Sequence, residues 1–171
     1  MLDGAGGIQW PLPEGSVPEV KERRLFADGC FYHPDGRARF HFDMPTENPE
    51  PVDATYPLLL LTGRGTSAQW HTQTRSSKSD VLRKLYPEGI YVELNPQDAE
   101  AAGVGANAPI GVESRRGRIE ARVVITLTVR PGQVFIPMHY RETNRLTHPS
   151  FDPHSRQPNY KACAVRLTPL R

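Results

Sequence analysis

The sequence predicts one mainly β domain with short helices, built as a closed barrel and preceded by an irregular N-terminal extension. From residue 56 onward, about six or seven short apolar runs of strand length alternate with turn residues. Only two or three short segments carry helical signals. Residues 1 to about 50 have a different character, because Pro and Gly interrupt them and no helical period is sustained. A chain of 171 residues is long enough for one domain with a proper core plus an appendage.

The N-terminal extension contains one strand-like stretch and ends in a linker. Residues 37–42 alternate between apolar and polar side chains, which is typical of a strand. Residues 44–55 contain three prolines and are typical of a linker. We therefore divide the chain into an extension over residues 1–50 and a barrel domain over residues 51–171.

The first half of the barrel domain carries strand and helix signals in alternation. Apolar runs predict strands at residues 56–61 and 90–94. Residues 78–85 predict a helix. Residues 96–102 predict another, with Asn95 as N-cap, Pro96 at its first position and Gly103 as its end.

The second half predicts a hairpin and two further strands. Residues 110–114 and 118–129 form the hairpin, with its turn at Arg116–Gly117. Residues 134–138 and 163–167 complete the set. Composition alone does not distinguish one type of barrel from another.

Composition and charge argue against several classes of partner. The net charge of +2 is small and the arginines are scattered, so nothing indicates nucleic-acid binding. No apolar stretch approaches the roughly 20 residues of a membrane span. The first residues lack the basic and apolar regions of a signal peptide, which favours a cytoplasmic location.

The cysteines and histidines show no metal-binding spacing, and no metal site is expected in this chain. Cys30 and Cys163 are far apart, so we expect free, reduced thiols, with Cys163 buried in a strand. His148 and His154 flank a turn-rich segment and are expected in surface loops.

The most informative stretch follows the first predicted strand. Thr62-Gly63-Arg64 and residues 69–76 supply neutral hydrogen-bond donors and arginine forks, while Gly63 allows close approach of the backbone. Such a set suits an anionic ligand rich in hydrogen-bonding groups. An ordinary polar loop at the end of a strand has the same composition.

A series of blocks in this chain resembles the molybdopterin-dinucleotide-binding domain of molybdenum oxidoreductases, a family that includes nitrate reductases and formate dehydrogenases. In order, the blocks are 62–64 with 70–72, 94–99, 114–117, 132–137, 144–147, 152–158 and 160–165. Residues 69–75 resemble assimilatory nitrate reductases more than formate dehydrogenases. Residues 6–11 and 35–40 resemble the catalytic region that precedes this domain in the family.

The resemblance implies a six-stranded double-psi barrel that binds molybdopterin guanine dinucleotide. The cofactor contacts that it implies are Thr62, Gly63, Arg64, His71, Thr72, Thr74, Asn144, Gln157, Tyr160 and Lys161. His71 is expected to position the cofactor rather than to transfer protons, and Lys161 to supply a cation. No catalytic residue is expected. Residues 114–117 are interpreted as a turn with exposed charges, away from the chemistry.

The function that the resemblance implies is that of the C-terminal part of a nitrate reductase, holding bis-molybdopterin guanine dinucleotide for the reduction of nitrate to nitrite. Two cysteines cannot hold an iron–sulfur cluster. The cluster, the molybdenum and the substrate pocket would therefore belong to an N-terminal catalytic region, in cis or as a separate chain, and this chain alone is expected to be inactive. The alternatives are a stand-alone barrel acting as a binding or interaction module, or the equivalent domain of a formate dehydrogenase.

Overall fold

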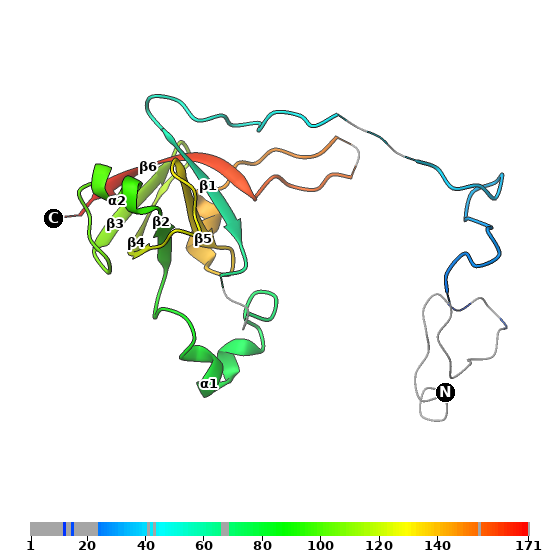
Figure 1. Ribbon diagram of the computed structural model, residues 1–171, viewed down its shortest axis with the longest axis horizontal. Helices are drawn as coiled ribbons and strands as arrows, with labels where there is room; N and C mark the ends of the chain where they lie inside the picture. Colours follow the sequence, from blue (N-terminus) through cyan, green and yellow to red (C-terminus); the bar gives the residue numbers. More distant parts are fainter. Residues whose placement is uncertain are drawn as a thin grey trace. The chain divides into compact units, whose positions relative to one another are not determined.

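The computed structural model describes residues 12, 15, 24–40, 42, 44–65, 69–153 and 155–170. The chain divides into two compact units, Met1–Pro45 and Thr46–Arg171. This boundary lies a few residues before the expected one between residues 50 and 51, because Glu50 is bound to barrel residues. The second unit contains all of the strands and helices that the structure describes (Figure 1).

The first unit is held by turns and ring contacts. Phe26 stacks on Phe31 with ring centroids 4.7 Å apart. The expected strand at residues 37–42 is not formed in residues 37–40 and 42, which the structure describes. Phe40 is 99% exposed and no described strand pairs with this stretch, so its alternating pattern has neither a sheet nor a core to face.

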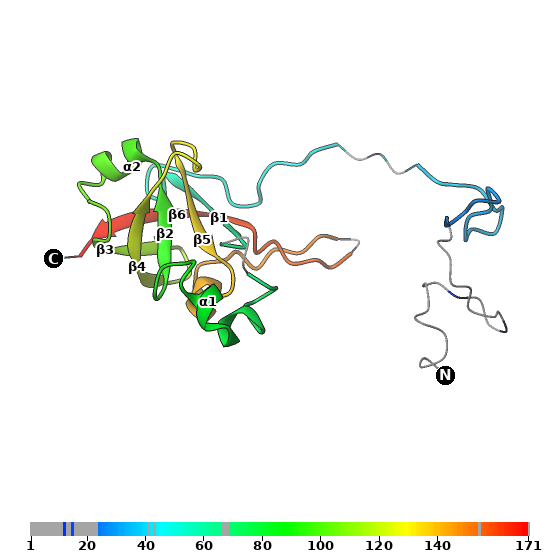
Figure 2. The same ribbon diagram turned by 60° about the horizontal axis from the view of Figure 1, so that its bottom comes forward.

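Six strands form a closed barrel, as the sequence predicts. They are β1 (Leu58–Gly63), β2 (Tyr91–Leu94), β3 (Pro109–Ser114), β4 (Arg118–Ile125), β5 (Gln133–Pro137) and β6 (Ala162–Pro169). Their order around the barrel is β1-β5-β2-β4-β3-β6, and β6 closes on β1 (Figures 1 and 2). The pairs β1/β5 and β2/β4 are parallel and the other pairs antiparallel. The mainly β, double-psi fold class is confirmed.

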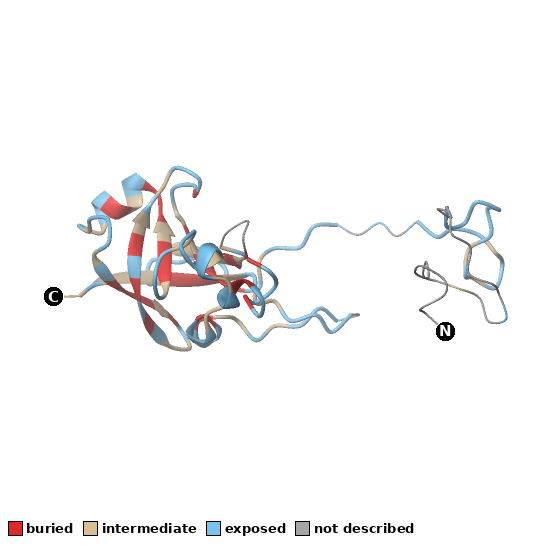
Figure 3. Cartoon of the chain, turned by 90° about the horizontal axis from the view of Figure 1, so that it is seen from below, coloured by how far each residue is buried: buried red, intermediate tan, exposed pale blue. Residues whose placement is uncertain are grey.

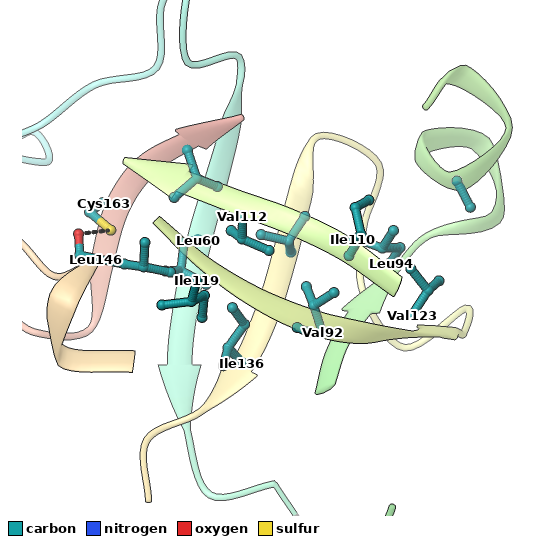
Figure 4. Packing of buried hydrophobic residues seen from close by; sticks show 14 residues of the cluster. Leu60, Val92, Leu94, Ile110, Val112, Ile119, Val123, Ile136, Leu146 and Cys163 are labelled. Carbon is teal, nitrogen blue, oxygen red and sulfur yellow. Dashed lines mark hydrogen bonds between the residues drawn. The ribbon is translucent and has the colours of Figure 1, made fainter. Parts of the chain in front are cut away.

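The core fills the interior of this barrel. In β4, Ile119, Ala121 and Val123 point inward and alternate with exposed residues, as the two-residue period of a strand requires. Leu60 of β1 and Ile136 of β5 are fully buried beside them, as Figure 4 shows, and Figure 3 shows buried positions along the strands of the barrel. The strands supply most of this core, and Ala99 and Leu146, from connections between strands, also belong to it.

The second helix, α2 (Pro96–Ala101), begins at the predicted residue and ends one residue before the predicted end at 102. The Asn95 side chain accepts a hydrogen bond from the Gln97 amide at 3.1 Å, and Pro96 occupies the first turn. After the helix, Gly103 adopts a φ of +66° and its amide donates to the Glu100 carbonyl. The local signals were therefore sufficient here.

The first helix is shorter than expected. Residues 78–85 predicted it, but α1 covers only Asp80–Arg83 and follows a 3-10 turn, η1 (Ser76–Lys78). Ser79 caps α1 by accepting from the Leu82 amide, while Val81 and Leu85 stay exposed. Without a buried face, nothing lengthens the helix. A second 3-10 turn, η2 (Arg141–Arg145), was not predicted. None of the described helices is long and apolar enough to cross a membrane.

Candidate functional site

The predicted binding segments meet at one end of the barrel. Strands β1 and β5 are parallel and both end there, while β6, antiparallel to β1, begins there. The Met138 amide donates to the Gly63 carbonyl at 2.8 Å, which joins the segment after β5 to the segment after β1. The site is therefore built from connections that the strands bring to one rim.

Thr62 links the first and last of the predicted contact segments. Its amide donates to the Lys161 carbonyl at 3.0 Å. Its hydroxyl donates to the Tyr160 carbonyl at 2.6 Å, across 98 residues of sequence. Because the hydroxyl hydrogen is used in this bond and Thr62 is buried, its side chain holds the Tyr160–Lys161 segment in place.

Gly65 is a site residue that the sequence reasoning missed. A Cβ atom at this position would lie 2.5 Å from Tyr91 Oη and 2.6 Å from Pro137 Cγ, both too close for a side chain. At Gly63 the corresponding distance, to a ring carbon of Phe135, is 3.3 Å. The spacing Gly-Arg-Gly was the available signal, since two glycines around an arginine let the backbone pass close to the barrel rim.

The loop that follows β1 is described at residues 64–65 and 69–76, and buried side chains within it hold its backbone by hydrogen bonds. Gln69 is buried; its Oε1 accepts from the Gly65 amide at 2.8 Å and its Nε2 donates to the His71 carbonyl at 2.7 Å. Ser76 is also buried, and its Oγ accepts from the Trp70 amide at 2.7 Å. The sequence analysis counted Gln69 and Ser76 among the donors available to a ligand; the structure shows instead that both are buried and bond within the loop.

The same loop has strained backbone. His71 has a φ of 54° and Gln73 a φ of 63°, values that residues with a Cβ adopt at a cost of about 1–3 kcal/mol each. Gln73 is buried, yet its Nε2 finds no hydrogen-bond partner within the described part of the chain. His71, Thr72 and Thr74 are exposed. Strain and an unpartnered buried donor are both typical of a loop shaped for a ligand.

The two predicted cations of the site are unpaired among the residues that the structure covers. Arg64 and Lys161 are exposed, and Lys161 Nζ lies 5.6 Å from the centroid of the Tyr160 ring. Gln157 is nearby, since its Nε2 donates to Tyr160 Oη at 3.3 Å. Gln157 and Lys161 also line a hollow of about 770 Å³ between residues 46–49, Leu59 and the hairpin of residues 150–159.

Asn144 lies at the same end of the barrel. The neighbouring Thr143 is buried and its hydroxyl donates to the Pro137 carbonyl at 3.1 Å, which fastens η2 to the end of β5. The Asn144 side chain is exposed and forms no hydrogen bond with other described residues. The structure thus brings Asn144 to the rim without joining it to the loop.

Residues 114–117 form a turn, as predicted, and Arg115 is exposed, but the expectation of an exposed charge is wrong for Arg116. Its guanidinium lies 2.6 Å and 2.7 Å from the two carboxylate oxygens of buried Glu50, and Arg115 binds the same carboxylate at 3.0 Å. Burial alone would raise the pKa of Glu50, but the hydrogen bonds from Arg116, the Ala164 amide and Arg115 lower it to about 2. Through these bonds the two arginines, between β3 and β4, hold the segment before β1 against the barrel.

The remaining expectations concern thiols, histidines and metals. Cys163 is buried in β6, as predicted, and burial raises its pKa to about 11. His148 is only partly exposed, and its Nδ1 is buried without a described partner. His154 and residues 6–11 lie outside the described residues. Within the described ranges, no group of three or more His, Cys, Asp or Glu could hold a metal ion.

Comparison with known proteins identifies the family. Residues 58–164 match the family model described as "Molydopterin dinucleotide binding domain". The chain belongs to this family. The cofactor of such domains is a molybdopterin dinucleotide, so the predicted class of cofactor is confirmed.

Three relatives show what else the chain is similar to. It is 38% identical to a nitrate reductase of Synechocystis sp. over 99% of this chain and 25% of the relative. It is 35% identical to an assimilatory nitrate reductase catalytic subunit of Bacillus subtilis, over 96% and 23%. It is 33% identical to the alpha subunit of an F420-dependent formate dehydrogenase of Methanococcus maripaludis, over 96% and 24%. The chain therefore spans about a quarter of the length of these relatives.

A solved structure agrees with the fold. Acetylene hydratase from Pelobacter acetylenicus superposes with a TM-score of 0.57 and 19% sequence identity, over 67% of this chain and 18% of that chain. At this level of identity the likeness concerns the fold alone.

Proposed function

We propose that this chain is the C-terminal part of a molybdenum-dependent nitrate reductase and that it holds bis-molybdopterin guanine dinucleotide for the reduction of nitrate to nitrite. One observation carries the proposal: Thr62 binds the backbone of both Tyr160 and Lys161, so the loop after β1 and the segment before β6 share one rim. A ligand as long as a dinucleotide needs contacts from segments of this kind, far apart in sequence.

The exposed groups at this rim fit the chemistry of the cofactor. A pyrophosphate is bound by cations and by neutral donors, which Arg64, Lys161, Thr72 and Thr74 supply. The Gln73 amide, buried without a described partner, is a donor in need of an acceptor. Gly65 allows the backbone to pass where a side chain would collide, and a Cβ at Gly63 would make a tight contact, 3.3 Å from the Phe135 ring. His71, Asn144 and Gln157 suit the polar edges of the pterin and the guanine.

In this proposal the residues of this chain bind and orient the cofactor, and none of them reacts. When bound, the molybdenum of the cofactor supplies oxygen-atom transfer. The molybdenum, the iron–sulfur cluster and the nitrate pocket depend on an N-terminal catalytic region, which matches the three quarters of the relatives' length that this chain does not span. We place the enzyme in the cytoplasm, with a role in nitrate assimilation, because the Bacillus subtilis relative is named an assimilatory enzyme.

Formate dehydrogenase is the second candidate. The Methanococcus maripaludis relative, at 33% identity, favours it. The nitrate assignment is preferred because residues 69–75 resemble assimilatory nitrate reductases, and because two of the three quoted relatives carry that name at higher identity. The remaining alternative, a stand-alone barrel that only binds a ligand, would act on neither nitrate nor formate.

Two measurements test the proposal. First, molybdopterin guanine dinucleotide is titrated into the chain and followed by tryptophan fluorescence, to which Trp70, exposed in the binding loop, contributes. We expect binding to be weakened by Lys161→Ala and unaffected by Arg130→Ala, since Arg130 precedes β5 at the opposite end of the barrel. Absence of binding by the unaltered chain, or equal effects of the two substitutions, would contradict the site.

The second measurement is viologen-linked reduction of nitrate and oxidation of formate. The chain alone should support neither reaction. The same chain preceded by its upstream catalytic region should reduce nitrate. Formate oxidation in its place would select the second candidate, and inactivity of that longer protein with both substrates would favour the stand-alone barrel.

A further inference from the structure

Glu50 is a buried carboxylate that lies outside the residues matched by the family model, 58–164. It comes from the segment before β1, where the sequence predicted only a linker. Only 6% of the residue is exposed. A buried charge is tolerated where it is fully paired, so its partners indicate what it does.

The carboxylate of Glu50 accepts four hydrogen bonds. Arg116 binds both of its oxygens, at 2.6 Å and 2.7 Å, and Arg115 binds Oε1 at 3.0 Å. The backbone amide of Ala164 donates to Oε2 at 3.1 Å. Glu50 therefore holds β6 directly, three residues after Lys161.

Arg116 carries the connection to a second segment. Its Nε and Nη2 donate to the Leu146 carbonyl at 3.1 Å and 2.8 Å, at the end of η2 and two residues after Asn144. Cys163 donates to the same carbonyl through its thiol at 3.2 Å, as Figure 4 shows. One carboxylate thus fixes the backbone beside two proposed cofactor contacts, although these lie on different segments.

We infer that Glu50 is a positioning residue for the dinucleotide site: by binding Arg116 and the Ala164 amide together, it sets Asn144 and Lys161 in their places without touching the cofactor. This inference rests on the proposed function. It also means that the functional domain begins near Thr46, upstream of the residues that the family model matches.

The alternative is that Glu50 only stabilises the barrel, and a matched variant separates the two. Glu113 also forms a carboxylate–arginine ion pair in this barrel, with Arg166 at 2.7 Å, between β3 and the far half of β6, although this pair is more exposed than that of Glu50. It has no bond to η2 or to the start of β6. Glu113→Gln therefore removes a carboxylate–arginine pair from the same barrel and leaves the proposed site alone.

The experiment uses the 171-residue chain and titrates molybdopterin guanine dinucleotide, with tryptophan fluorescence as the signal. We expect Glu50→Gln to weaken binding about ten-fold, the scale expected when contacts shift by a fraction of an ångström. Glu113→Gln should leave binding within about two-fold of the unaltered chain, because distant sites act independently. A lower melting temperature of Glu50→Gln with binding equal to that of Glu113→Gln would overturn the inference.

Two additions keep the test decisive. Arg116→Lys retains a positive charge but cannot bind both Glu50 oxygens and the Leu146 carbonyl together, so it should also weaken dinucleotide binding, and it replaces Glu50→Gln in the test if that variant does not fold.

Amide hydrogen exchange without ligand should rise at residues 143–147 and 160–164 in the Glu50 variant and not in the Glu113 variant. Failure of the unaltered chain to bind the dinucleotide counts against the proposed function, and the exchange result then decides the inference alone.

Discussion

Replacing Gly65 by Ala is expected to destabilise the protein through two collisions. The new methyl group would lie 2.5 Å from Tyr91 Oη and 2.6 Å from Pro137 Cγ. The Pro137 ring is fully buried in β5 and cannot move away. Such overpacking costs about 1–3 kcal/mol, so we expect the free energy of unfolding to fall by about 2 kcal/mol. In urea this corresponds to a midpoint lower by about 1 M for a domain of this size.

The matched control is Gly105→Ala. A Cβ at Gly105 meets no heavy atom within 4 Å and its φ is not positive, so this change should be neutral or stabilising by up to about 1 kcal/mol. Adding Tyr91→Phe to Gly65→Ala removes the collision with the hydroxyl but leaves the one with Pro137, so recovery should be partial. Equal stability of the Gly65 and Gly105 variants would refute the reasoning, and so would complete recovery in the double variant.

Three further predictions concern charge, binding and thiol reactivity. Because its bonds lower the pKa of Glu50 from 4.5 to about 2, its contribution to stability is complete above pH 4.5 and is lost as the pH falls towards 2. Glu50→Gln should remove this part of the acid sensitivity, up to about 3 kcal/mol, in urea unfolding measured across that range. Arg64→Ala should weaken dinucleotide binding by about 1.5–3 kcal/mol without changing the urea midpoint, whereas Arg130→Ala should change neither; a matching loss with Arg130→Ala would count against the site. Cys30 is exposed and should react at once with a thiol reagent at mildly alkaline pH, while Cys163, buried and with its pKa raised to about 11, should react only on unfolding.

Much of the barrel could be predicted because its signals are local. Asn95, Pro96 and Gly103 mark α2 through caps that involve only near neighbours. The alternation in β4 is likewise visible in eight consecutive residues. The candidate segments of the site were chosen from exposed polar residues and from the resemblance, and the structure adds that they share one rim.

What the sequence did not reveal depends on distant partners. Glu50 and Arg116 are 66 residues apart, and no sequence feature near either residue indicates that the two form an ion pair. Gln69 is an ordinary polar residue until its two bonds are seen. At residues 37–42 the error is the opposite one, a strand that was predicted but is not formed in the described residues. An alternating pattern is compatible with a strand, but a strand also requires a neighbouring strand to pair with.

The closure of β1 on β6 sets the order in which this site can be made. Leu60 pairs with Cys163, and the neighbours of β1 are β5 and β6, which are the last two of the six barrel strands in sequence order. A growing polypeptide therefore carries β1 unpaired until nearly the whole domain has left the ribosome, and closing so long a loop is slow. Thr62 cannot hold Tyr160 before that moment. The proposed cofactor site can thus form only after β6 has been synthesised, and the cofactor can be loaded only after that point.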